Sequence, residues 1–267
     1  MGERNIRLLA AYDGTDFSGW QRQDPQSGSG GQGPSAGPGR RTVQGCIEDA
    51  LGKIHKHPVP IFGSGRTDAG VHAAGQVANF YTDIGSMDAD RFVPALNSLL
   101  PRDIRILDSR ETYPGFHARF DAKARTYRYH VIAGRPALPH ELRYNLHLRR
   151  SPDIGLLNDY ARLLRGELDC GLFASPQDPS KSRRRYISQA YFFIQGDTLV
   201  FEIQANAFLW KMVRSITGTL LHYEERRLPP ADFADMVRSA DRSRAGPTLP
   251  PQGLFLWKID YYQSPCA

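Results

Sequence analysis

The sequence predicts an α+β protein built on a largely antiparallel sheet. Residues 125–132 alternate cleanly between two faces, which is typical of a strand. Residues 191–195 and 199–204 are two further strand-like runs, and Gly196-Asp197 between them predicts a β-hairpin. Since such strands are mixed with segments of helical periodicity, an antiparallel sheet with packed helices is favoured.

The first half of the chain supplies a strand, an insert, a helix and a second pair of extended segments. We expect a strand at 6–11 and a flexible, solvent-exposed insert at 23–41, which contains six glycines, three prolines and three serines. Arg40 and Arg41 end this insert, either as plain linker or as an RNA contact. Thr42 is the predicted N-cap of a helix whose apolar face is Val43, Cys46, Ile47, Ala50, Leu51 and Ile54. Extended segments at 59–62 and 75–81 and a helix at 91–100 follow.

The second half supplies further strands and two helices. A helix at 154–164 is predicted to end at Gly166, because glycine commonly terminates helices. Residues 207–223 have the strongest helical pattern, and residues 253–261 are expected to form a closing strand.

Composition is typical of a soluble globular protein. The chain has 267 residues, with 40% apolar and 23% charged residues, enough for one large domain or two modest ones. No apolar run is long enough to span a bilayer, and no signal peptide is visible. Cys46, Cys170 and Cys266 lie far apart without disulfide or metal spacing, which favours a cytoplasmic location.

The positive charge is concentrated in one stretch. The net charge is +6, and residues 122–152 hold seven cationic side chains against Glu141 alone, a net of +6. Tyrosines are interleaved with these cations, a mixture suited to phosphates and bases. A second basic cluster, in a predicted loop, is Lys181, Arg183, Arg184 and Arg185. The pattern favours a polyanionic partner over a solvated face without a ligand.

The run from Gly63 to Ala73, Gly-Ser-Gly-Arg-Thr-Asp-Ala-Gly-Val-His-Ala, contains the chain's most informative carboxylate, Asp68. It sits two residues after Arg66 and two before Gly70, on a loop expected between extended segments. Glycines there permit close approach of a ligand, and a carboxylate held beside a cation suits a nucleophile. The alternative is a glycine-rich turn in which Asp68 only caps the next segment.

This run resembles the GRTDAGVHA motif of the bacterial tRNA pseudouridine synthase A family. The resemblance continues through residues 12–21 (Tyr-Asp-Gly-Thr-Asp-Phe-Ser-Gly-Trp-Gln) and residues 253–256 (Gly-Leu-Phe-Leu), so it covers nearly the whole chain. It implies a pseudouridine synthase fold with two α/β halves, 1–112 and 113–267, around a central cleft. It also implies a homodimer and a tRNA substrate modified in the anticodon stem-loop, at positions 38, 39 and 40.

The resemblance assigns the chemistry to three residues. Asp68 corresponds to the family's nucleophile, and the sequence leaves open whether it attacks C1′, attacks C6 or assists a glycal route. Arg214 is the cation expected to keep Asp68 ionised, and a helical wheel places it away from the apolar stripe Leu209, Met212, Val213, Ile216 and Leu220. Tyr127 is expected to stack on uracil, although alternation alone also fits a core aromatic. The isomerisation oxidises nothing and releases no group, so no cofactor is expected.

Further residues are assigned to binding. Arg66 is expected to occupy the gap left by the flipped base, or else to bind only a phosphate. Leu254 is expected to line the uracil pocket. Arg125, Arg149 and Arg150 are expected to contact the RNA. No metal site is expected, because the histidines lack ligand spacing: His55, His57, His72, His117 and His147.

One departure and two competing function classes remain. Where the family usually has Gly-x-His-Asp-Phe, this chain has Leu168 and Cys170 in place of the histidine and phenylalanine. A non-catalytic RNA-binding or chaperone protein would retain the basic surface but gain nothing from Asp68. A nucleoside or glycoside hydrolase would usually need a second carboxylate, and no motif supplies one.

Overall fold

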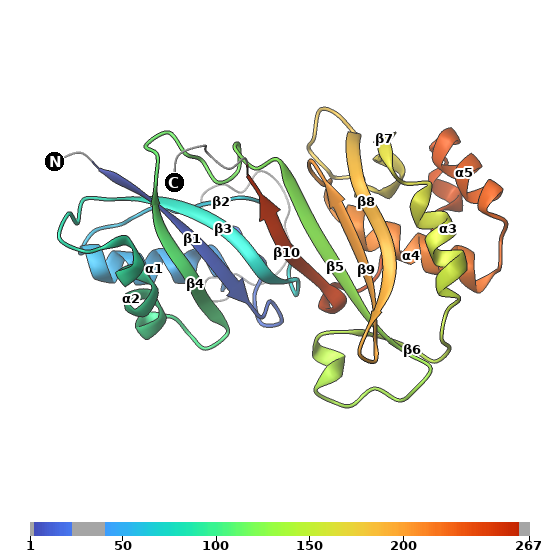
Figure 1. Cartoon of the computed structure of the whole chain (residues 1–267), viewed down its shortest axis with the longest axis horizontal. Helices are drawn as coiled ribbons and strands as arrows, with labels where there is room; N and C mark the ends of the chain where they lie inside the picture. The colour runs from blue at the N-terminus through green and yellow to red at the C-terminus, as the bar shows by residue number, and fades with distance from the viewer. Residues whose placement is uncertain (1–2, 23–40, 262–267) are drawn as a thin grey trace, which may run out of the picture. The chain divides into compact units, whose positions relative to one another are not determined.

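The computed structural model describes residues 3–22 and 41–261 (Figure 1). The chain divides into two compact units, Met1–Ala122 and Lys123–Ala267, and each is described by itself. The boundary predicted after residue 112 is the end of strand β4 (Ile104–Thr112), and the first unit continues beyond it to Ala122. The predicted insert at 23–41 lies outside the described residues except for Arg41.

The first unit is organised around strand β1 (Arg4–Tyr12), which pairs antiparallel with a strand on each side. Ile6, Leu8 and Ala10 on one of its faces are fully buried. Their alternation is the reason that the predicted strand at 6–11 forms here. The other strands are β2 (Phe62–Gly63) and β4 (Ile104–Thr112), with β3 (His72–Thr82) pairing with both β1 and β2.

Two helices pack in the first unit, and both were predicted. Helix α1 (Val43–His55) begins after Thr42, whose hydroxyl accepts a hydrogen bond from the Gly45 N–H at 3.2 Å, so the predicted N-cap is confirmed. Helix α2 (Phe92–Leu99) follows a short 3₁₀ turn (Ala89–Arg91) and contacts α1 and β4. Pro94 lies in its first turn, where proline costs no hydrogen bond.

Arg41 is held firmly to the first unit. Its guanidinium donates two hydrogen bonds to the Asp103 carboxylate, at 2.6 and 2.8 Å. It also lies 4.1 Å from the centre of the Phe17 ring. A bidentate pair that also stacks on an aromatic ring fixes this residue in place.

The second unit has a sheet in the order β10–β5–β9–β8–β7, in which each strand is antiparallel to its neighbours. A short sixth strand, β6, pairs parallel with β5. The prediction of an α+β protein with a largely antiparallel sheet is therefore confirmed. The strands are β5 (Ala124–Ala133), β6 (Leu146–Leu148), β7 (Gly166–Asp169), β8 (Arg184–Gln195), β9 (Thr198–Ala205) and β10 (Leu254–Asp260).

Three helices belong to the second unit and lie together beside β8 and β9 in Figure 1: α3 (Ile154–Arg162), α4 (Met212–Glu225) and α5 (Pro230–Ser239). Helix α5 was not predicted, although Pro229-Pro230 marks its start and Phe233 and Met236 on it are buried. Short 3₁₀ turns are Glu141–Arg143, Gly171–Phe173, Arg242–Arg244 and Pro251–Gly253. Every described helix falls short of the length and apolar content needed to cross a membrane.

Three predicted boundaries are wrong. Helix α4 begins at Met212 rather than 207, because Lys211 has φ 64°, a left-handed conformation that cannot continue a helix. Helix α3 ends at Arg162, and Gly166 opens strand β7 with φ 102° instead of ending the helix. Arg184 and Arg185, expected in a loop, form the start of β8, paired with β7.

A close backbone approach joins α4 to residues 246–250. A Cβ on Gly218 of α4 would lie only 1.8 Å from the Pro247 carbonyl oxygen. One turn earlier, the Arg214 carbonyl accepts a hydrogen bond from the Leu249 N–H at 3.3 Å. Only glycine allows this contact, so Gly218 determines where the helix carrying Arg214 lies.

We expect Gly218→Ala to lower the free energy of unfolding by about 1–3 kcal/mol through overpacking, despite alanine's better helix propensity. Gly52→Ala in α1 is the matched control, because the nearest atom to its added Cβ is 3.5 Å away. That variant should be neutral or more stable by up to about 1 kcal/mol. Urea denaturation measures both, and equal effects at the two positions would contradict the steric explanation.

Candidate active site

Asp68 lies on the loop that joins β2 to β3, as predicted. Its side chain is half-buried. The turn that follows is closed by a hydrogen bond from the Val71 N–H to the Asp68 carbonyl at 3.2 Å, and Gly70 has φ 76°. Gly70 therefore supplies a left-handed conformation that other residues adopt only at a cost.

The beginning of this loop is fixed to strand β3. The Ser64 N–H donates to the Val77 carbonyl at 2.8 Å, and its hydroxyl bonds to the Gln76 amide oxygen at 2.6 Å. The Gln76 amide nitrogen donates to the Gly65 carbonyl at 2.9 Å. Ser64 and Gln76 are both buried, so these bonds form away from competing water.

The central part of the loop is held by residues 12–21, which we call the clasp segment. The Trp20 N–H donates to the Thr67 carbonyl at 3.1 Å, and the Gly70 N–H donates to the Phe17 carbonyl at 3.3 Å. The Tyr12 hydroxyl and the Thr67 hydroxyl are 2.8 Å apart and hydrogen-bonded. The backbone is thus fixed on both sides of Asp68.

Two glycines of the clasp segment make this contact possible. Gly19 has φ 97°, and a Cβ there would lie 2.6 Å from the Thr67 carbonyl oxygen. A Cβ on Gly14 would lie 1.9 Å from the Val71 carbonyl oxygen. This structural role of Gly14 and Gly19 was not predicted, although paired glycines in a short motif are a signal of close backbone approach.

His72 is fully buried and connects β3 to the clasp segment. Its Nδ1 lies 3.0 Å from the Gly14 nitrogen and 3.2 Å from Asp13 Oδ1. The Gly14 amide can only donate, so Nδ1 accepts this bond.

The described histidines do not form a metal site. Within residues 3–22 and 41–261, no group of three or more His, Cys, Asp or Glu side chains is arranged to hold a metal ion. His55 bonds the Leu51 carbonyl and the Thr82 hydroxyl instead, and His147 bonds the Arg135 carbonyl.

Arg66 is exposed beside Asp68 in the same loop. Its Nε donates to the Gln21 side-chain oxygen at 3.1 Å, at the end of the clasp segment. Because the side chain is exposed, its guanidinium can still donate to other partners.

In the second unit, Arg214 and Tyr127 lie near the 246–250 segment and strand β10. Arg214 is half-buried on α4, and its Nε donates to the Leu249 carbonyl at 2.6 Å. Tyr127 is 9% exposed, and its ring packs edge-to-face on Phe208 with 5.0 Å between centroids. Leu256 is the partner of Tyr127 in the β10–β5 ladder, and Leu254, also buried, is the partner of Tyr129.

Tyr129 contributes structure to this region rather than a titrating group. Burial raises the pKa of Tyr129 above its ordinary range, while the positive charge of Arg214 acts in the opposite direction. Its hydroxyl donates to the Pro250 carbonyl at 2.8 Å. A neutral Tyr129 therefore fastens the 246–250 segment to β5 at physiological pH.

The three predicted RNA-binding arginines have different surroundings. Arg125 donates to the Asn206 carbonyl at 2.7 Å, and Arg149 is exposed. Arg150 forms a bidentate ion pair with Glu224, a carboxylate that is 1% exposed and also accepts a hydrogen bond from the Asp153 N–H. Removing Arg150 would leave that buried charge with less compensation, so Arg150 has a structural role here.

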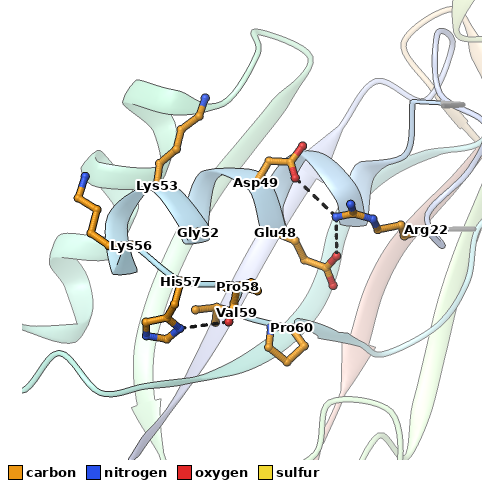
Figure 2. A pocket seen from close by; sticks show the side chains of 10 residues that line it. All are labelled: Arg22, Glu48, Asp49, Gly52, Lys53, Lys56, His57, Pro58, Val59 and Pro60. Atoms are coloured by element: carbon orange, nitrogen blue, oxygen red, sulfur yellow. Dashed lines mark hydrogen bonds and ion pairs between the residues drawn. The ribbon is translucent and has the colours of Figure 1, made fainter. Parts of the chain in front are cut away.

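A surface pocket of about 790 Å³ lies elsewhere on the first unit, along α1 and the segment that precedes β2 (Figure 2). Arg22 at one end lies 3.4 Å from Glu48 and 3.5 Å from Asp49. Lys53 on α1 and Lys56, directly after the helix, point outward in Figure 2. None of the predicted site residues lines this pocket, so the predicted chemistry does not belong to it.

The departure from the family pattern is accommodated by the local packing. Leu168 lies in β7, and Cys170, directly after that strand, is fully buried. Burial raises the pKa of the Cys170 thiol to about 12, so it acts as a small apolar group rather than a nucleophile. Cys170 and Cys46 are both free, and Cys266 lies outside the described residues.

Comparison with known proteins confirms the resemblance. The family model described as tRNA pseudouridine synthase matches residues 8–121 and 160–262. The chain is 54% identical to tRNA pseudouridine synthase A of Treponema denticola, over 97% of this chain and 93% of that protein. Proteins of the same name from Caldicellulosiruptor saccharolyticus and Geobacillus kaustophilus are 40% and 39% identical, over 97% and 98% of this chain and 100% and 96% of theirs. The chain therefore belongs to the tRNA pseudouridine synthase A family.

Proposed function

We propose that this protein is a tRNA pseudouridine synthase in which Asp68 is the nucleophile that converts uridine to pseudouridine. The observation that carries the assignment is the fixed loop around Asp68, whose flanking backbone is bonded to the clasp segment at Thr67 and Gly70. Family membership supplies the reaction, an isomerisation in which no redox or group-carrying cofactor takes part. A preorganised carboxylate reduces the cost of reaching the reactive geometry.

The reaction breaks the bond between ribose C1′ and N1, rotates the uracil and joins C5 to C1′. C5 then loses its proton to solvent and N1 gains one, so the product is an isomer of the substrate. Asp68 provides the electron pair, either at C1′, at C6 or through a glycal route. We propose that Arg214 supplies the positive charge that keeps this carboxylate ionised. Tyr127 then stacks on the uracil, and Leu254 provides an apolar wall against it.

Extraction of the base is assigned to Arg66. A base that leaves a stem costs a few kcal/mol of stacking and pairing, and a planar guanidinium can fill the gap. The exposed position of Arg66, two residues before Asp68 and hydrogen-bonded to Gln21, supports this role.

The finer substrate assignment follows the family resemblance. We propose that the substrate uridines lie at positions 38, 39 and 40 of the anticodon stem-loop, and that the protein acts as a cytoplasmic homodimer. Arg125 and Arg149 contact the RNA backbone in this proposal, and the basic stretch at 122–152 supplies the attraction that tRNA phosphates require.

Asp68→Asn should abolish the release of tritium from C5-labelled uridine in tRNA, because an amide cannot act as the nucleophile, while the Kd for tRNA stays within about twofold of wild type. Asp49→Asn, at an exposed position on α1, is the control and should retain activity. Tritium release at the wild-type rate by Asp68→Asn would refute the assignment. Loss of tRNA binding together with activity would point to a structural role.

Arg149→Gln should reduce the slope of log Kd against log salt concentration by about one, because one phosphate contact is lost. Arg238→Gln removes an exposed arginine paired with Asp235 on α5 and should leave the slope unchanged. Arg150 is not substituted in this experiment, because its loss would remove the ion pair of the buried Glu224 carboxylate. An unchanged slope for Arg149→Gln, measured by filter binding across a salt series, would exclude this residue from the RNA contact.

A further inference from the structure

Thr67, the residue before Asp68, is bonded to the clasp segment at two points. Its carbonyl accepts the Trp20 N–H at 3.1 Å, and its hydroxyl bonds to the Tyr12 hydroxyl at 2.8 Å. Tyr12 is 5% exposed and Thr67 is 7% exposed, so water has little access to the hydroxyl pair. Tyr12 is the last residue of β1, the strand at the middle of the first unit's sheet.

This arrangement connects the Asp68 loop to the buried central strand of its unit. Consecutive Cα atoms are about 3.8 Å apart across a trans peptide, so a displacement of Thr67 is passed directly to Asp68. Ile6, Leu8 and Ala10 anchor β1 in the core, and the Tyr12 ring lies 6.0 Å from that of Trp20. The hydrogen bond between the Tyr12 and Thr67 hydroxyls therefore fixes the position of the loop relative to the sheet.

We propose that Tyr12 is a positioning residue for the isomerisation, acting through the Thr67 hydroxyl to hold the Asp68 backbone in its reactive placement. The inference rests on the proposed function, because it assumes that Asp68 is the reacting group. Tyr12 does not touch the substrate in this account, and its effect is on the rate of the chemical step and not on tRNA affinity.

Because two hydroxyls form this bond, its effect on the stability of the fold can be separated from its effect on the position of Asp68. Removing one hydroxyl takes a hydrogen bond from the buried hydroxyl that remains, which destabilises the fold, whereas removing both replaces the hydroxyl pair by an apolar contact. The double variant does not recover the position of Asp68, because the hydrogen bond is absent from it as well as from both single variants. The double variant should thus regain stability relative to either single variant but not regain rate.

The test compares Tyr12→Phe, Thr67→Val and the double variant in single-turnover tritium release with saturating enzyme. We expect each to lower the single-turnover rate constant about tenfold, with the double variant no slower than the singles and the Kd for tRNA unchanged. Thr67→Ser, which keeps the hydroxyl, should restore most of the rate. Thermal unfolding of every variant records stability separately.

Tyr160→Phe is the matched control. Tyr160 is also a fully buried tyrosine, whose hydroxyl donates to the Leu228 carbonyl at 2.5 Å in the second unit, and its loss should lower stability without changing the rate constant. If Tyr12→Phe behaves like Tyr160→Phe, with lower stability and an unchanged rate constant, the positioning role is overturned. If Asp68→Asn remains active, the proposed function itself fails, and this outcome is distinct from a normal rate in Tyr12→Phe.

Discussion

The backbone contact between the clasp segment and the Asp68 loop is the constraint on which the candidate site depends. Trp20 and Gly70 donate across it, and Gly14 and Gly19 have no side chain because carbonyl oxygens of the loop occupy that space. Carboxylates on loops are ordinarily mobile, which would slow any reaction that depends on the position of the carboxylate. Here two segments about 50 residues apart in sequence are hydrogen-bonded to each other. These bonds fix the backbone of the Asp68 loop and so limit where the Asp68 side chain can lie.

In the second unit, Arg214 is likewise held in place through a close backbone contact. Gly218 lets the 246–250 segment approach α4, and Leu249 then exchanges backbone and side-chain hydrogen bonds with Arg214. Tyr129 fastens the other end of that segment through Pro250. In each unit, a residue proposed to take part in the reaction is held through hydrogen bonds of carbonyl and amide groups. Such groups need hydrogen-bond partners when they are buried, so few alternative arrangements are open to them.

Local pattern was sufficient to predict much of the fold and the loop that carries Asp68. The β1 alternation, the Thr42 cap and the Gly196-Asp197 hairpin are properties of neighbouring residues, so sequence reveals them. The start of α4 was missed because the left-handed Lys211 interrupts an otherwise good helical pattern. The pairing of Tyr12 with Thr67 and of Arg150 with Glu224 spans 55 and 74 residues, and no periodicity encodes such contacts. The family motifs indicated the candidate catalytic and binding residues, but not the residues that hold them in position.

The ion pairs of Arg22 and Arg41 have a consequence for the connection between these two residues. Arg22 contacts acidic residues on α1, and Arg41 is clamped between Asp103 and Phe17, so the chain is anchored on either side of residues 23–40. Closing a longer connection between two fixed points adds only about 0.6 kcal/mol for each doubling of its length. A change in the length of residues 23–40 should therefore cost little stability and leave the clasp segment and α1 in place.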